Sequence, residues 1–246
     1  MDFLLLLLAK SRIIISNIVK NFGSEIMGKL FSYDNKVMQI LAKIADIFIV
    51  SILWIVLCLT VVGFGPACSA AYYAMAKCVR RDRGNIFKEF WNALRSNFGQ
   101  ALLLGLLTTI FGVSLFFFDF AEIANAVLNQ QPMDAWRMGF RALKIFLFSG
   151  LCLYLFPIQS RFQTKSVWIV VTSLLVMFRH IGKTVAMIAL LVVIVCVAIL
   201  YPGFAIVMPG ILFYLISFPM EKVLAKLVNE SGLGESDEEN PWYLEK

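Results

Sequence analysis

Long apolar runs separated by short polar segments make up most of the chain. An apolar run predicts a membrane-crossing helix when it holds roughly 20 residues, with a range of about 17–25. Pro202 and Gly203 alone separate two of the runs, so they predict a tight turn between crossings. The runs are Ile44–Val62, Ala101–Phe118, Ile145–Phe156 (which reaches spanning length by starting near Met138), Val185–Leu200 and Phe204–Phe218.

A sixth segment, Gly65–Val79, is only just long enough to cross. Pro66 suits the first turn of a new helix, because the N–H that it lacks would be unpaired there anyway. Small residues recur at helical spacing and would let helix backbones approach closely within lipid. We interpret the segment as a short crossing buried among the others, with a re-entrant hairpin as the alternative. The helix-packing candidates are Gly65, Ser69, Ala70 and Ala74.

The placement of the basic residues favours six crossings. With the N-terminus inside, all of the 22 Lys and Arg residues except Arg137, Arg141 and Lys144 fall on the cytoplasmic side. This asymmetry is what the positive-inside rule predicts. A non-spanning Gly65–Val79 would put the first two basic clusters on opposite faces. We therefore expect both termini to be cytoplasmic.

Between crossings, Asn85–Gln100 has the apolar periodicity of an amphipathic helix. Such a helix lies on the membrane surface or on a partner protein. Ser166–Arg179 precedes a crossing in the same way, which suggests that a unit of crossing, surface helix and crossing is used twice in the same orientation. The partner-docking candidates on the first helix are Phe87, Phe90, Trp91, Leu94 and Phe98.

Composition agrees with these patterns. The 246 residues are 60% apolar and 15% charged, whereas soluble domains are about 45–50% apolar and about 25% charged. The sequence thus predicts an all-α polytopic membrane protein with about six transmembrane helices, amphipathic cytoplasmic interfacial helices and a parallel two-fold repeat. A disordered chain, a disulfide scaffold and an ordinary soluble enzyme are excluded.

Candidate chemistry is sparse. The five cysteines form no C-x-x-C pair, and His180 is the single histidine, so no metal site is assigned. The chain has no phosphate-binding G-x-x-x-x-G-K-[ST] and no H-E-x-x-H motif. We therefore assign no catalytic or cofactor-binding residue and expect neither an enzyme nor a nucleic-acid-binding protein.

Charged residues near the outer surface are the exception. Arg137, Arg141 and Lys144 share one helical face, and Asp119 could meet them, as could Glu122 and Asp134. Such a group either extends toward lipid headgroups with local pairing or forms a polar outer cavity that holds a solute or a carboxylate of a partner protein. Two further carboxyl groups, those of Asp46 and Glu221, lie at the ends of crossings, where we expect them to be close to water.

The two ends of the chain differ from the middle. Met27 opens MGKLFSYDNKVM, which looks like a translation start, so we expect residues 1–26 to be an upstream-start extension or a surface-lying helix. Residues 27–228 form the expected membrane domain. Residues 229–246 are polar and acidic, and they predict a flexible cytoplasmic tail.

Several stretches resemble the YesL family of bacterial integral membrane proteins, which has no assigned biochemical activity. They are MGKLFSYDNKVM (27–38), IADIFIVSILWIVLCLTVVGFGPACSAAYYAMAKCVR (44–80), GNIFKEFWNALRSNF (84–98) and YLFPIQSRF (154–162). The resemblance covers nearly all of residues 27–228. It implies a bacterial cytoplasmic membrane and genes beside binding-protein-dependent sugar importers, glycoside hydrolases and sensor kinases for carbohydrates.

From this resemblance we expect an accessory or regulatory membrane subunit of a carbohydrate ABC importer, acting by helix–helix packing and interfacial-helix docking. Its partners would be membrane lipid and importer permease subunits, and a homo-oligomer stays open. One alternative is a stand-alone transporter of a small sugar-derived solute. Another is a membrane component of carbohydrate sensing that works with a histidine kinase.

Overall fold

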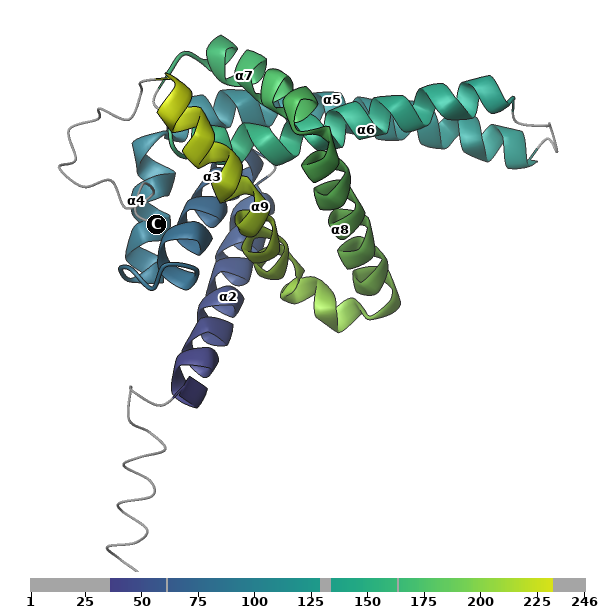
Figure 1. Ribbon diagram of the computed structural model, residues 1–246. Helices are drawn as coiled ribbons and strands as arrows, with labels where there is room; N and C mark the ends of the chain where they lie inside the picture. The colour runs from purple at the N-terminus through teal and green to yellow at the C-terminus, as the bar shows by residue number, and fades with distance from the viewer. Residues whose placement is uncertain (1–35, 61, 129–133, 163, 232–246) are drawn as a thin grey trace, which may run out of the picture. The chain divides into compact units, whose positions relative to one another are not determined.

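The computed structural model describes residues 36–60, 62–128, 134–162 and 164–231 (Figure 1). The chain divides into two compact units, 1–45 and 46–246. Of the first unit only residues 36–45 are described, as the start of a helix that continues into the second unit. The packing and the sites described below lie in the second unit. The expected extension at 1–26 and the tail from residue 232 lie outside the described residues. The last helix continues to Ser231, three residues past the expected end of the membrane domain.

Within the described ranges the chain is helical, with no strand. A short 3-10 helix stands at the turn expected at Pro202 and Gly203. The elements are α2 (Lys36–Cys58), α3 (Phe64–Ala74), the π-helix η1 (Met75–Val79), α4 (Ile86–Ser96), α5 (Phe98–Leu128), α6 (Ala135–Gln159), α7 (Ser166–Arg179), α8 (Ile181–Leu200), the 3-10 helix η2 (Pro202–Ile206) and α9 (Met208–Ser231).

Four of the described helices are long and apolar enough to cross a membrane: Met38–Cys58 of α2, Phe98–Asp119 of α5, Ala135–Gln159 of α6 and Ile181–Leu200 of α8. They coincide with four of the expected crossings. The other two differ. Residues 65–79 are divided between α3 and η1, and the expected crossing at Phe204 begins inside η2 and continues as α9. A six-crossing arrangement therefore stays a prediction.

Helix α3 is buried on every side. Nine of its eleven residues are buried, as expected of a helix that is apolar all round. It packs against α4, α5, α6 and α9. The approach to α5 is closest at Gly65 and Gly105, where a Cβ atom on Gly65 would overlap the carbonyl oxygen of Ala101 and lie 2.5 Å from the Cα of Gly105. The interpretation of this segment as buried among the others is confirmed.

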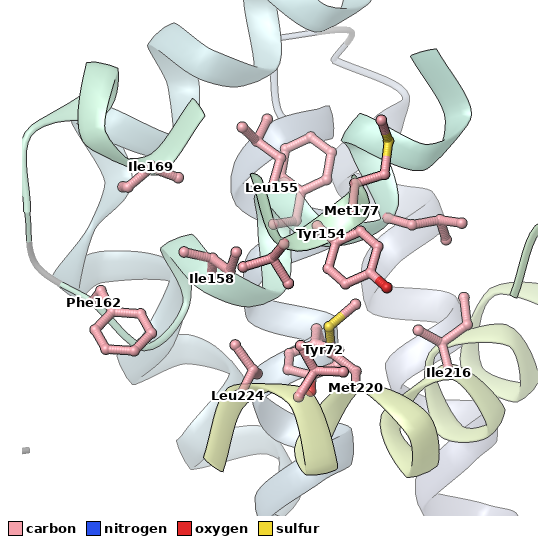
Figure 2. Close-up of a cluster of buried hydrophobic side chains, with 14 of the residues drawn as sticks. Tyr72, Tyr154, Leu155, Ile158, Phe162, Ile169, Met177, Ile216, Met220 and Leu224 are labelled. Atoms are coloured by element: carbon pink, nitrogen blue, oxygen red, sulfur yellow. The ribbon is translucent and has the colours of Figure 1, made fainter. Parts of the chain in front are cut away.

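The main core lies where α3 and α6 meet α7 and α9 (Figure 2). Tyr72 of α3 and Tyr154 of α6 are fully buried there, beside Met220 and Leu224 of α9. The Tyr154 hydroxyl lies 3.1 Å from Thr184 Oγ1 on α8. Apolar packing in this core is thus combined with a hydrogen bond between helices, which lipid cannot replace.

Two single-residue corners have similar geometry. Asn97 (φ −126°, ψ 26°) separates α4 from α5, and His180 (φ −119°, ψ 43°) separates α7 from α8. The short helix before each corner also packs on an earlier α-helix: α4 packs on α3, and α7 packs on α6. The expected helix Asn85–Gln100 accordingly ends at Ser96, and Phe98 already belongs to α5. The two-fold repeat itself stays a prediction.

Replacing Gly65 by Ala should destabilise the fold, because the added Cβ meets backbone that cannot move aside. We expect a loss of about 1–3 kcal/mol, the usual cost of overpacking. Thermal unfolding in detergent would measure it. Gly99→Ala is the matched control, since nothing lies within 4 Å of its Cβ position. Equal melting temperatures for the two variants would contradict the close α3–α5 approach.

Candidate functional site

A buried carboxylate in the middle of α9 joins this helix to α3 and to the end of α6. Glu221 of α9 is 4% exposed. The Tyr72 hydroxyl of α3 donates a hydrogen bond to Glu221 Oε1 at 2.8 Å, and Arg161 Nη2, just beyond α6, donates to the same oxygen. The guanidinium of Arg161 is itself buried, with 2% of its side chain exposed. We call Tyr72, Arg80, Arg81, Arg161 and Glu221 the Glu221 cluster.

The π-helix η1 brings two more arginines to the Glu221 cluster. Arg81 Nη2 lies 3.8 Å from Glu221 Oε2. Arg80 Nη1 donates to the carbonyl oxygen of Ser217 at 2.5 Å, and its guanidinium lies 5.0 Å from the centre of the Phe218 ring. Both arginines therefore attach η1 to α9. π-helices are rare and often occur at functional sites.

The electrostatics of the cluster are those of one anion among several cations. Burial lowers the pKa of the Arg81 guanidinium. Glu221 opposes this effect, whereas the positive charges of Arg161 and Arg80 lower the pKa further. A buried ion of either sign is costly unless it is paired and hydrogen-bonded. Glu221 is therefore needed to compensate the arginines, and the arginines to compensate Glu221.

The Glu221 cluster continues into a neutral hydrogen bond. Ser69 Oγ of α3 donates to Gln159 Oε1 of α6 at 3.1 Å, and both residues are buried. Tyr72 lies one helical turn from Ser69, so α3 contacts the end of α6 and the middle of α9 through the same face. Chemically, this arrangement can fix helices in register.

Helix α4 is attached to the same region. Its Asn85 cap accepts hydrogen bonds from the N–H groups of Phe87 at 3.1 Å and Lys88 at 3.4 Å. Lys77 of η1 pairs with Glu89 of α4 at 2.9 Å. The cap thus closes the first turn of α4, and the ion pair joins that turn to η1.

The docking candidates on and beside α4 divide into two groups. Phe90 and Leu94 are 1% and 6% exposed and pack in the cluster with Ala70, Ala71 and Ala74 of α3. A docking role does not fit these two residues, because their side chains are already enclosed by the chain itself. Phe87 and Trp91 are 57% and 40% exposed on α4, and Phe98 is 46% exposed at the start of α5.

The helix-packing candidates all lie inside the chain. Gly65, Ser69, Ala70 and Ala74 are buried. Gly65 lies against α5, Ser69 bonds to α6, and Ala70 and Ala74 pack with α4. Their surface is therefore used within this chain and is not available to a partner helix. Docking by helix packing through this face, as expected from the sequence, does not fit the structure.

The structure brings the four outer candidates together as ion pairs between α5 and α6. Lys144 Nζ lies 2.8 Å from Asp119 Oδ1, and Arg141 Nε lies 3.8 Å from the same oxygen. Arg141 Nη2 also pairs with Glu122 Oε2 at 2.5 Å. Arg137, whose side chain is 65% exposed, lies between Glu122 and Asp134. Acidic groups of the chain itself thus compensate these cations.

A cavity of about 710 Å³ lies elsewhere, between α2, α3, α5, α6, α8 and the start of α9. Its wall is largely apolar and aromatic. Trp54 and Phe64 meet edge to face with ring centroids 6.2 Å apart, and Phe64 meets Phe156 in the same way at 5.8 Å. The volume is within the range of about 300–1,000 Å³ that is typical of small-molecule sites.

Comparison with known proteins gives a match to one family over part of the chain. Residues 47–120 match the family described as "Protein of unknown function, DUF624". This match supports the expected resemblance to a YesL-type family of uncharacterised proteins. The chain is also 28% identical to "Uncharacterized protein YteU" of Bacillus subtilis (strain 168) over 159 residues. The aligned region covers 62% of this chain and 68% of that protein. No solved structure matches the chain.

The DUF624 match contains α3, η1 and α4, and so it includes Tyr72, Arg80 and Arg81 but neither Arg161 nor Glu221. Sequence reasoning missed the Glu221 cluster and expected Glu221 to be close to water. One signal was present: apolar positions continue beyond it at Val223, Leu224 and Val228. That continuation indicates a helix that stays in the core past the carboxylate.

Replacing Glu221 by Gln should destabilise the protein strongly, because it breaks the buried ion pair between Arg161 and Glu221. Breaking a buried pair in this way costs about 3–5 kcal/mol. The control is Glu122→Gln, whose side chain is 49% exposed and whose pairing should contribute about 0–1 kcal/mol. Unfolding in detergent would measure both.

The double variant Arg161→Met/Glu221→Leu removes the two most buried charges together and leaves Arg81, whose side chain is 22% exposed, to be solvated by water. It should recover much of the lost stability, because apolar replacements of a buried pair are often neutral. A double variant less stable than Glu221→Gln would contradict the pairing of these two side chains.

Proposed function

We propose that the protein is an accessory subunit of a carbohydrate ABC importer in the bacterial cytoplasmic membrane, and that it docks on the permease through α4. The observation that carries the proposal is the two-sided character of α4. One side is fixed to α3 and η1, and the other presents Phe87 and Trp91 to the outside. We call Phe87 and Trp91 the α4 stripe.

The α4 stripe has the properties of a protein-binding anchor. Phe87 and Trp91 are four residues apart and therefore neighbours on one helix face. The Arg95 guanidinium lies 5.2 Å from the centre of the Trp91 ring, which favours one position of the indole. Aromatic and arginine side chains held on a rigid element dominate the binding energy of many interfaces.

The choice of partner comes from the YesL resemblance, which implies a setting of carbohydrate uptake. The proposal includes six crossings with both termini in the cytoplasm, which would place α4 on the cytoplasmic side. There it could reach the cytoplasmic loops of a permease. A stand-alone sugar transporter is less well supported, because the 710 Å³ cavity offers few polar groups to a sugar. Carbohydrate sensing with a histidine kinase has support from the resemblance alone.

Trp91→Glu should weaken binding to the importer without preventing membrane insertion. A buried carboxylate in place of an anchor costs about 2 kcal/mol or more of binding free energy. The measurement is affinity purification of the tagged protein from its host in mild detergent, with mass spectrometry of the copurifying permeases.

Asn92→Glu is the matched control, because it adds the same charge one residue along α4 at an exposed polar position. Equal recovery of permease with both variants would contradict docking through the α4 stripe. Recovery of the parent protein alone, or only with further copies of itself, would contradict the importer subunit altogether. Phe90→Glu is unsuitable for this test, since Phe90 is a core residue.

A further inference from the structure

The 710 Å³ cavity lies among helices of membrane-crossing character. Its walls come from α2, α5, α6 and α8, which are the four candidate spans, together with α3, η2 and α9. Any occupant is therefore a molecule that can reach a site within the bilayer. This region is separate from the α4 stripe, and its occupant does not depend on the proposed partner.

The polar groups in the cavity wall are mostly engaged by the chain itself. Thr108 Oγ1 donates to the carbonyl oxygens of Leu104 and Gly105, each at 3.0 Å. Ser149 Oγ donates to the Ile145 carbonyl oxygen at 2.7 Å. The Trp54 indole N–H is directed at Cys68 Sγ, 3.4 Å away. A sugar or an ion would leave most of its own polar groups unpaired here, at a high cost in an apolar site.

An apolar occupant has no polar groups of its own to leave unpaired, although it leaves the Thr109 hydroxyl of the wall without a hydrogen-bond partner. Trp54, Phe64 and Phe156 form a continuous aromatic wall through edge-to-face contacts, and Phe213 extends it from Trp54 at 6.5 Å. These rigid rings contact one another, so they hinder collapse of the cavity. If the cavity were empty, the atoms that line it would lack dispersion contacts on that side. The shape thus favours a flexible hydrocarbon that fills it.

The cavity also reaches the outer surface of the bundle. Two of its lining residues are exposed: Val113 of α5, at 49%, and Ala205 of η2. Val113 belongs to a candidate span, so this exposed wall would face lipid once α5 crosses a bilayer. The most abundant hydrocarbon at this opening is the bilayer itself.

We propose that this cavity binds one acyl chain of a membrane phospholipid, which enters between α5 and η2 and lies against the aromatic wall of Trp54, Phe64 and Phe156. The headgroup stays outside the cavity, at the membrane surface. The bound chain replaces the side chains that would otherwise be needed to join α2, α5 and α9, so it is a structural component of the bundle.

Fluorescence quenching tests the proposal directly, because Trp54 lines the cavity. Trp91, Trp136, Trp168 and Trp242 are replaced by Phe, leaving Trp54 as the sole tryptophan. The protein is placed in vesicles of phosphatidylcholine that carries bromine in the middle of its acyl chains. Bromine quenches indole on contact, so we expect strong quenching.

A cavity-filling variant separates the bound chain from bulk lipid. Ser149→Leu occupies part of the space and should lower the quenching by about half, since a site of this size admits one chain and little more. Val193→Leu is the control, because Val193 is 59% exposed on α8 and does not line the cavity. Equal quenching in the parent and in Ser149→Leu would overturn the proposal.

A second measurement does not depend on how the variant folds. The parent protein, purified in detergent and washed, should retain phospholipid at one molecule per chain, as quantified by mass spectrometry of an organic extract. Retention of no phospholipid would overturn the proposal. Retention of a different apolar molecule in its place, such as an isoprenoid, would likewise overturn the assignment to a phospholipid.

Discussion

The enclosure of α3 is the constraint on which the rest of the structure depends. Lipid tails are as apolar as leucine, so the hydrophobic effect provides no force between helices within a bilayer, and close packing and hydrogen bonds must replace it. Small side chains on α3 let α5 approach until the backbones touch at Gly65 and Gly105. On its other sides, α3 contacts α4 through Ala70 and Ala74. A bulkier α3 would separate its neighbours and expose the polar contacts that fix them.

The Glu221 cluster depends on the same enclosure. Arg161 and Tyr72 both contact Glu221, although they precede it in the sequence by 60 and 149 residues respectively. The cluster therefore exists only when α3, the end of α6 and α9 are in register. A misplaced helix would leave a charge buried without a partner, which is more costly than a misplaced apolar contact. We infer that apolar packing brings the helices together and that the charges select one arrangement of them. Because η1 and α4 are joined to this region through Arg80, Arg81 and Lys77, the position of the α4 stripe is determined by the same contacts.

The sequence predicted those features that depend on length and local composition. Four spans, the turn at Pro202 and the limits of α7 follow from apolar runs and their interruptions. The end of α4 was not predicted, because apolar periodicity continues through Asn97 to Phe98. Nor could periodicity distinguish Phe90 from Phe87, since both lie on the apolar face and only contact with α3 decides which is enclosed. The outer ion pairs were predicted as a group because Arg137, Arg141 and Lys144 share a face. The Glu221 cluster was missed because its partners are distant in the chain and no local pattern joins them.

The π-helix η1 has a consequence for how this segment tolerates insertion and deletion. A π-helix is an α-helix that has accommodated one additional residue. The wider turn, with i→i+5 in place of i→i+4 hydrogen bonds, absorbs that residue, so the residues after it keep the face they would have in an α-helix one residue shorter. Arg80 and Arg81 come directly after η1, so both guanidinium groups stay directed at α9 despite the additional residue. Loss of a single residue between Met75 and Val79 would therefore leave a regular α-helix with both arginines on the same face, whereas loss of a residue from the regular turns of α3 would rotate them by about 100° and separate them from the carboxylate that compensates them.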